Sequence, residues 1–264
     1  MKALKQLLGK TLLATACLGT AVSAMADVLS DIKARDEIRI AVPQDFPPFG
    51  SVGADLKPQG IDVDMAYYIA DQLGVDLTIV PVTSANRIPY LQTNKVDLVI
   101  SSLGKNPERE KAIDFSTPYA PFFLGVFGDQ SVAVGALQDL SGKTVGVTRG
   151  SVEDLELEKN APSDVTIQRF EDNNTTLTAY LSGQVNLIAT GNLVATEIAK
   201  RKPARAPEAK FMLKDSPCYI GMAKGEAALQ SEVNAIIAKA LAEGKLNDIS
   251  VKWLKAPLPK GFGA

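Results

Sequence analysis

The sequence predicts an α/β fold with two lobes, in which each lobe is a mixed sheet flanked by helices. Two observations predict it. Strands and helices alternate along the first hundred residues, which is typical of an α/β unit. The same order of elements then begins again near residue 144. Two lobes therefore explain the chain better than the alternative, one long sheet.

The first unit follows from local periodicity. Residues 38–42 alternate like a strand, whereas apolar residues recur every fourth position from Ile61 to Leu73, a helical stripe that Gly74 ends. Prolines and glycines between residues 44 and 60 indicate a loop or hairpin. We expect, in order, a helix (27–35), a strand (38–42), this loop, a helix (61–73), a strand (76–81), a short helix (88–93) and a buried strand (96–100).

The second unit repeats this order. The stretches Val96–Ile100 and Val185–Ala189 resemble each other, since each follows a short helix and a polar turn. We expect a strand (144–148), a helix (152–159), a strand (165–169), a helix (174–182), a strand (185–189) and a helix (193–201).

Two β-prone stretches, 119–127 and 218–223, could cross between the lobes, the second after a loop at 202–214. Helices at 227–241 and 245–254 would return to the first lobe. The predicted boundaries are 27–120 with 217–264 for lobe 1 and 121–216 for lobe 2.

The 264-residue chain contains no histidine. This excludes Ser-His-Asp and Cys-His nucleophilic sites, histidine acid–base catalysis and every histidine-ligated metal site. The two cysteines, Cys17 and Cys218, are too few for a metal cluster. We therefore expect no metal, no cofactor and no catalytic residue.

Residues 1–26 have the pattern of a secretory signal peptide. Three lysines precede an apolar stretch at 11–22, and Ala24-Met-Ala26 is a small-x-small site, so we expect cleavage after Ala26 and a periplasmic protein. A lipoprotein attached through Cys17 is the alternative, and the apolar run is short for a retained anchor. After cleavage at Ala26, Cys218 would be the only thiol, which precludes an intramolecular disulfide.

Charge gives no sign of a nucleic-acid partner. Removal of residues 1–26 takes away three of the 28 basic residues and none of the 30 acidic ones, which leaves a net charge of −5. The rest of the chain has no basic patch interleaved with aromatic residues, so nucleic acid is not expected to bind.

The ends of the expected strands point to a ligand site. In open α/β sheets, ligands bind beyond the carboxyl ends of the strands. Here all those ends carry polar or small residues, so two lobes that face each other would bring them into one cleft. These ends are Gln44–Phe49, Ser84–Arg87, Ser101–Gly104, Arg149–Glu153 and Thr190–Asn192.

Several segments together resemble a known family, the periplasmic polar amino-acid-binding proteins of ABC importers (solute-binding family 3). They are Asp45–Phe49 (DFPPF), Gly60–Asp64 (GIDVD), Ser101–Arg109 (SSLGKNPER), Ile113–Tyr119 (IDFSTPY), Leu140–Val147 (LSGKTVGV) and Lys252–Leu254 (KWL). Residues 80–89 (VPVTSANRIP) resemble the glutamate/aspartate-binding branch. The resemblance covers essentially the whole chain after residue 26, and it implies a two-lobed clamp with two hinge strands that closes on one amino acid.

The resemblance also implies roles in the first lobe. Arg109 matches the arginine that grips the ligand's α-carboxylate, and its guanidinium can form two parallel charge-assisted bonds to a carboxylate; the alternative is a solvated residue in a charged run. Ser102 matches a serine on the same carboxylate. Gly104 stands where the family usually has serine or threonine, so only its backbone amide remains.

The other implied contacts come from both lobes. Phe46 matches the aromatic residue against the ligand's side chain, and Ser84 and Arg87 match pocket positions of the glutamate/aspartate branch. Arg87 could instead pair with a surface acid. Ser151 and Val152 match the second-lobe turn whose backbone amides complete the carboxylate site, although Val152 replaces the usual threonine.

One departure concerns the ligand's ammonium group. The aspartate that accepts from it in the family falls on Gly191, with Asn192 beside it, and no carboxylate stands there. A buried ammonium without a counter-charge is costly. Either Glu153 or Asp154 takes over this role, or the ligand lacks a free ammonium; Glu153 at a helix N-terminus could equally serve the helix dipole.

The expected function is therefore binding without catalysis. The protein, a monomer, would capture a small polar amino acid, including dicarboxylic ones, by lobe closure and deliver it to a membrane permease. The alternatives are a dehydratase on the same scaffold, with Glu153 as general acid, and a partner that presents its ligand to a chemoreceptor.

Overall fold

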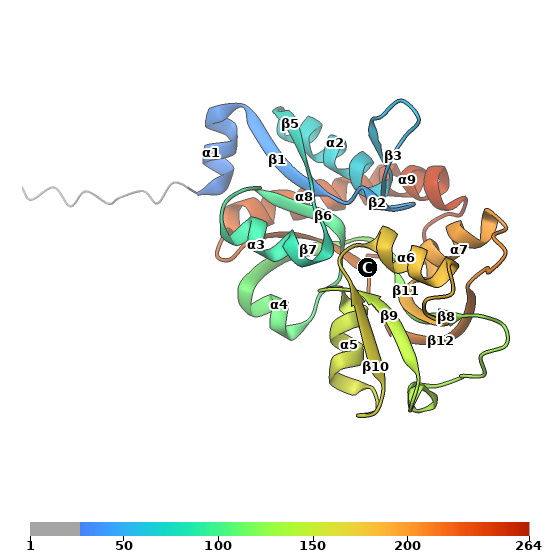
Figure 1. Ribbon diagram of the computed structural model, residues 1–264. Coiled ribbons are helices and arrows are strands. Elements are labelled where there is room, and N and C mark those ends of the chain that lie inside the picture. Colours follow the sequence, from blue (N-terminus) through green and yellow to red (C-terminus); the bar gives the residue numbers. More distant parts are fainter. Residues whose placement is uncertain (1–26, 264) are drawn as a thin grey trace, which may run out of the picture.

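The computed structural model describes residues 27–263, so the predicted signal peptide and Cys17 lie outside the described part. Two five-stranded sheets and one small three-stranded sheet form the fold. Helices flank both large sheets, which confirms the predicted fold class (Figure 1). Among residues 27–263, no helix has both the length and the apolar character needed to cross a bilayer.

The first sheet has the strand order β5-β1-β6-β13-β7. It is mixed, because β1 runs parallel to β5 and β6, whereas β13 runs antiparallel to β6 and β7. The strands are β1 (Glu37–Val42), β5 (Asp76–Pro81), β6 (Leu98–Leu103), β7 (Ile113–Ala120) and β13 (Cys218–Ala223). A small sheet beside it contains β2 (Asp45–Phe46), β3 (Gly50–Val52) and β4 (Pro58–Gln59).

The helices on this sheet follow the predicted apolar stripes. Helix α2 buries Ile61, Met65 and Ile69, and it ends at Gly74, whose φ of 70° is the left-handed conformation that glycine adopts without strain. The helices are α1 (Val28–Arg35), α2 (Ile61–Leu73), η1 (Ser84–Asn86), α3 (Arg87–Gln92), α4 (Pro107–Ala112), α8 (Ala227–Ala242) and α9 (Lys245–Leu254). We call these elements, with the first and the small sheet, the first unit.

The second unit is built on the sheet β10-β9-β11-β8-β12. Strands β10 and β11 each run parallel to β9, whereas β8 pairs antiparallel with β11 and β12. The strands are β8 (Phe123–Gly128), β9 (Thr144–Thr148), β10 (Thr166–Phe170), β11 (Leu187–Gly191) and β12 (Glu208–Asp215). The helices are η2 (Leu137–Leu140), α5 (Val152–Asn160), α6 (Asn173–Leu181) and α7 (Asn192–Lys200).

Three sequence predictions were wrong in detail. The predicted loop at 202–214 contains most of β12, and the predicted continuous stretch 119–127 is two strands, separated at Pro121 and Phe122. The strands expected at 96–100 and 185–189 both begin two residues later. Before β6, the Asp97 amide donates to the Arg39 carbonyl at 2.9 Å, but the Arg39 amide donates to the Asp97 carboxylate at 2.8 Å, so a side chain supplies the acceptor for that amide.

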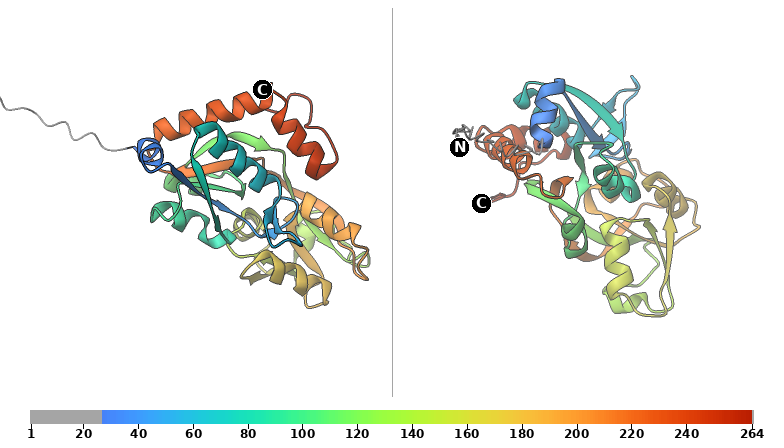
Figure 2. Two further views of the ribbon diagram at one scale, coloured as in Figure 1. Left: turned by 90° about the horizontal axis from the view of Figure 1, so that it is seen from above. Right: turned by 90° about the vertical axis from the view of Figure 1, so that its left-hand side faces the viewer.

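The chain crosses between the units twice, at residues 121–122 and 216–217. The two crossovers lie side by side, because the Ser216 amide donates to the Phe122 carbonyl at 3.0 Å. Phe122 also packs edge-on against Phe49 and Phe46 of the first unit, at ring-centroid distances of 4.8 and 6.1 Å. The apolar core is thus continuous from one unit to the other. The right-hand view of Figure 2 shows the first unit above the second.

Candidate functional site

A cavity lies between the units, at the carboxyl ends of β6, β9 and β11. Its interior space is about 20 Å³, room for about one water molecule, so an amino acid does not fit between the units in this arrangement. Both units and both crossovers contribute to its wall. The lining residues are Phe46, Ser84, Arg87, Ser102, Phe122, Leu124, Thr148, Ser151, Val152, Glu153, Asn173, Ala189, Thr190 and Ser216.

Two oppositely charged side chains line this cavity, one from each unit. Arg87 begins α3 and Glu153 lies in the first turn of α5; they are 4% and 5% exposed. The Arg87 guanidinium donates to the carbonyl oxygens of Ser84 and Ser101, at 3.2 and 2.8 Å. Burial lowers the pKa of Arg87 and raises the pKa of Glu153, and the attraction between the two charges opposes both shifts.

Arg109 lies beside the cavity and does not line it. Its Nη1 donates to the Gly104 carbonyl at 2.7 Å, and its Nη2 donates to the Gly150 carbonyl at 2.9 Å, which joins the two units. Burial, with repulsion from Arg87, lowers the pKa of Arg109 to about 9. Arg109 and Arg87 share a neighbouring hollow of about 270 Å³. The predicted role of Arg109 in gripping a carboxylate stays a prediction.

Ser102 reaches the cavity through a conformation that needs support. Its φ of 42° is left-handed, which is uncommon for a residue with a side chain. The fully buried Asp62 holds it there, because Oδ2 accepts from the Ser102 amide at 2.8 Å and Oδ1 accepts from the Tyr119 hydroxyl at 2.5 Å. Burial raises the pKa of Asp62 to about 7, despite these two donors and the nearby Arg87.

The turn before α5 separates the two candidate ammonium acceptors. Ser151 caps the helix, accepting from the Asp154 amide at 3.1 Å. Asp154 turns toward its own unit, where it accepts from the Gly150 amide and from Arg169 Nε at 2.9 and 2.7 Å. Glu153 lines the cavity, whereas Asp154 is not among the lining residues. Of the two, Glu153 is therefore placed to meet a ligand.

At the two glycines among the predicted site residues, Gly104 and Gly191, neighbouring side chains occupy the space that a side chain would need. A Cβ at Gly191 would overlap the Phe122 ring, so this aromatic residue fills the space that a side chain at 191 would need. Asn192 accepts from the Phe123 amide at 3.3 Å and does not line the cavity. Gly104 is likewise outside the lining, and a Cβ there would overlap Ser216 Oγ.

Seven of the eleven predicted site residues line the cavity: Phe46, Ser84, Arg87, Ser102, Ser151, Val152 and Glu153. The lining residues that the prediction missed are Phe122, Leu124, Thr148, Asn173, Ala189, Thr190 and Ser216. Thr148 and Ala189 end predicted strands, and Thr190 begins a strand-end segment that was expected at the cleft, so the sequence held a usable signal for all three. Phe122 and Ser216 lie on the crossovers, which the strand-end argument does not reach.

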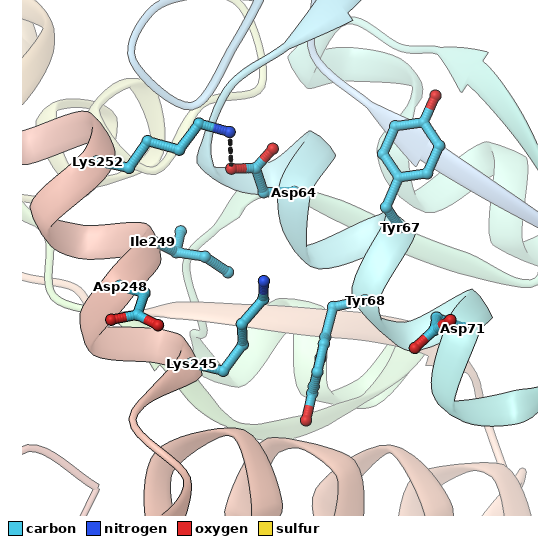
Figure 3. Close-up of a pocket in the computed structure, with 8 residues that line it drawn as sticks. All are labelled: Asp64, Tyr67, Tyr68, Asp71, Lys245, Asp248, Ile249 and Lys252. Atoms are coloured by element: carbon cyan, nitrogen blue, oxygen red, sulfur yellow. Dashed lines mark hydrogen bonds and ion pairs between the residues drawn. The ribbon is translucent and has the colours of Figure 1, made fainter.

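A larger hollow of about 530 Å³ lies on the outer surface, between α2 and α9 (Figure 3). Its lining includes Tyr67, Tyr68 and Lys245, and a Lys252–Asp64 ion pair of 2.7 Å closes one end. All its lining residues belong to α2 and α9 of the first unit. It is separate from the candidate site.

Two α/β units joined by two crossovers, with an enclosed polar cavity between them, define a solute-binding protein. The family model for bacterial extracellular solute-binding proteins, family 3, matches residues 38–256. The chain belongs to this family, whose members are exported.

Named relatives extend this result. The chain is 27% identical over 251 residues to an L-cystine-binding protein of Escherichia coli K12, covering 92% of each chain. It is 30% identical over 234 residues to an ABC transporter glutamine-binding protein of Bacillus subtilis, covering 87% of this chain and 85% of the relative. The crystal structure of a cysteine-binding protein from Campylobacter jejuni matches with a TM-score of 0.82 and 26% identity, covering 89% of this chain and 96% of that one.

Proposed function

We propose that this protein is the periplasmic solute-binding component of an ABC importer, which captures a small polar α-amino acid and delivers it to a membrane permease. The observation that carries this proposal is the pair Arg87 and Glu153, two buried opposite charges that line one enclosed cavity from opposite units. The relatives named for cystine and glutamine support the class of solute.

An amino acid complements this pair. Its carboxylate fits the Arg87 guanidinium through charge-assisted bonds, and its ammonium fits the Glu153 carboxylate. The backbone amides at the amino end of α5, beside Val152, offer further donors to the carboxylate, because the first amides of a helix have no partner within it. Neither unit alone holds both charged groups, so the ligand favours the closed arrangement.

We propose a dicarboxylic amino acid as the preferred ligand. Two buried arginines, Arg87 and Arg109, lie near a single buried glutamate, Glu153. A second carboxylate on the ligand offers the second arginine a charge-assisted partner, which a neutral side chain does not. The resemblance of residues 80–89 to the glutamate/aspartate branch agrees with this choice.

The proposal includes the organisation of the chain. Residues 1–26 act as a signal peptide that is cleaved after Ala26, and the mature protein is a monomer. Residues 27–120 with 217–264 form one lobe and residues 121–216 the other. The crossovers at 121–122 and 216–217 support these boundaries. Every strand of the second large sheet lies between them in the sequence, and every strand of the first large sheet lies outside them.

The test is calorimetric titration and thermal shift of refolded, ligand-stripped protein (residues 27–264). The panel contains L-glutamate, L-aspartate, L-glutamine, L-arginine, L-cystine and the ammonium-free acids glutarate and succinate. At about 100 times Kd a ligand stabilises the protein by about 2.7 kcal/mol. We expect the largest shift with L-glutamate or L-aspartate. The proposal fails if no amino acid of the panel binds, or if prephenate, the substrate of a dehydratase, is turned over.

Three matched variants assign the carboxylate contact. We expect Arg87→Gln to weaken binding at least a hundredfold, since a buried guanidinium that meets the ligand is lost. Arg149→Gln removes a half-exposed arginine next to the α5 turn and serves as the control, with binding unchanged. Arg109→Gln decides which buried arginine binds the carboxylate. A larger loss of affinity in Arg109→Gln than in Arg87→Gln would assign the main carboxylate contact to Arg109.

A further inference from the structure

Two residues of the cavity wall belong to neither large sheet. Phe122 and Ser216 lie on the two crossovers, and the Ser216 amide donates to the Phe122 carbonyl at 3.0 Å. The connection between the units is therefore part of the site itself. A ligand that contacts Phe122 or Ser216 therefore contacts the crossovers, the segments about which we expect the units to move.

The Ser216 hydroxyl has no hydrogen-bond partner within the described residues, although Ser216 is only 4% exposed. Among buried side-chain polar atoms of residues 27–263, the only other one without a partner is Tyr68 Oη, at the outer hollow. A buried hydroxyl without a partner costs free energy, so it calls for an explanation. The position of this hydroxyl on the cavity wall provides one.

The surroundings keep space open for this hydroxyl. Gly104, near the end of β6, carries no side chain, and a Cβ there would overlap Ser216 Oγ and lie 2.8 Å from Val152 Cγ2. Ser216 Oγ thus lies between the end of β6 and the first residue of α5. The amino end of α5 favours a carboxylate, so the hydroxyl lies next to the place proposed for the head of the ligand.

We propose that Ser216 is a ligand-binding residue on the crossover, whose hydroxyl bonds to the charged head of the captured amino acid. The inference rests on the proposed function and adds a third anchor to it. Arg87 bonds the ligand to the first unit, Glu153 bonds it to the second, and Ser216 bonds it to the connection between them. A hydroxyl both donates and accepts, so it can serve the carboxylate or the ammonium.

Ser216→Ala tests the assignment, because it removes only the hydroxyl. With L-glutamate, or with the amino acid of the panel that binds best, we expect Kd to rise about tenfold or more, as for the loss of a hydrogen bond to a charged group. The melting temperature of the ligand-free variant should stay the same or rise, since no bond within the protein is lost. Glutarate, which lacks the ammonium, assigns the partner: an equal loss indicates the carboxylate, and a smaller loss the ammonium.

Ser250→Ala is the matched control. Ser250 is also 4% exposed, but its hydroxyl donates to the Ala256 carbonyl at 2.8 Å, far from the cavity. We expect this variant to melt earlier with an unchanged Kd. The inference is overturned if Ser216→Ala binds within twofold of wild type. If wild type binds no amino acid of the panel, the proposed function fails first, and the inference with it.

Discussion

At the scale of single residues, Asp62 connects stability to the geometry of the site. It is fully buried, yet it accepts from both the Ser102 amide and the Tyr119 hydroxyl. Its carboxylate thereby holds Ser102 in a left-handed conformation at the cavity wall. Burial makes the ionised form of this carboxylate unfavourable, and the pKa of Asp62 is therefore raised to about 7.

This pKa predicts a pH dependence. Because the folded protein binds the Asp62 proton more tightly than the unfolded chain, the free energy of unfolding should fall as pH rises from about 4 to about 7, and this contribution should be constant above that range. The raised pKa of Glu153 acts in the same direction. Urea unfolding at a series of pH values should show a steeper fall for wild type than for Asp62→Asn.

Asp62→Asn is the isosteric comparison. Its amide oxygen can still accept from the Ser102 amide, while its NH2 group donates to the Tyr119 oxygen. Between pH 4 and pH 7, we expect the free energy of unfolding of Asp62→Asn to increase relative to that of wild type by a few kcal/mol. Parallel curves over this range would show that Asp62 does not titrate there.

The residues that the sequence places at strand ends include several that line the cavity. Arg87, Ser102 and Glu153 lie at or just after the carboxyl ends of predicted strands, so the sequence indicates them. It does not indicate Ser216, because its role depends on where the crossovers lie in space. Nor does it show that Phe122 covers Gly191, since this contact joins residues 69 positions apart.

At the scale of elements, β2 and α6 meet across the cavity. Asp172 caps α6, accepting from the Thr175 amide at 2.7 Å. Asp45 of β2 adds a second acceptor from the other unit: it accepts from the Asn173 amide at 2.7 Å and from Asn173 Nδ2 at 3.2 Å. This carboxylate therefore contributes only when the units are closed.

We expect Asp45→Ala to raise the Kd for the best amino acid of the panel about tenfold, because bonds to a charged acceptor are lost from the closed form. The change should appear mainly as faster dissociation in stopped-flow measurements. The ligand-free melting temperature should change little. Asp55→Ala, in the exposed loop between β3 and β4, is the control. An equal loss of affinity in both variants would exclude a specific contact.

The elements themselves were largely predictable. Helix α2 and strand β5 have the predicted bounds, because a clear stripe or a short β-prone run ends at a glycine or proline in each case. Strand β12 was missed, since its sequence, Glu208–Asp215, is rich in charge and only partly buried. Its pairing with β8 determines its structure, and pairing between residues 80 to 92 positions apart leaves no local pattern.

At the scale of the whole molecule, the enclosed cavity implies movement. An interior of about 20 Å³ with walls from both units leaves no room for an amino acid in this arrangement of the units. We expect the units to separate at the crossovers, so that a ligand that bonds to both units shifts the population toward the closed form.

Small-angle scattering should detect this shift. A compact chain of this length has a radius of gyration of about 18 Å. We expect a larger value for ligand-stripped protein, which decreases toward the compact value when the best amino acid of the panel is added. The same concentration of a non-binding amino acid should leave the curve unchanged. Identical curves with and without ligand would show that binding does not require closure.

The position of β13 has a consequence for how the chain acquires its structure. β13 lies between β6 and β7, but residues 218–223 follow the whole second sheet along the chain. The second sheet, from residues 123–215, can assemble as soon as its own segment is present. The first sheet cannot be completed until β13 has been synthesised, and until then β6 and β7 each have an unpaired edge. Such non-local pairing is slow. The part of the protein that is synthesised first is therefore completed last.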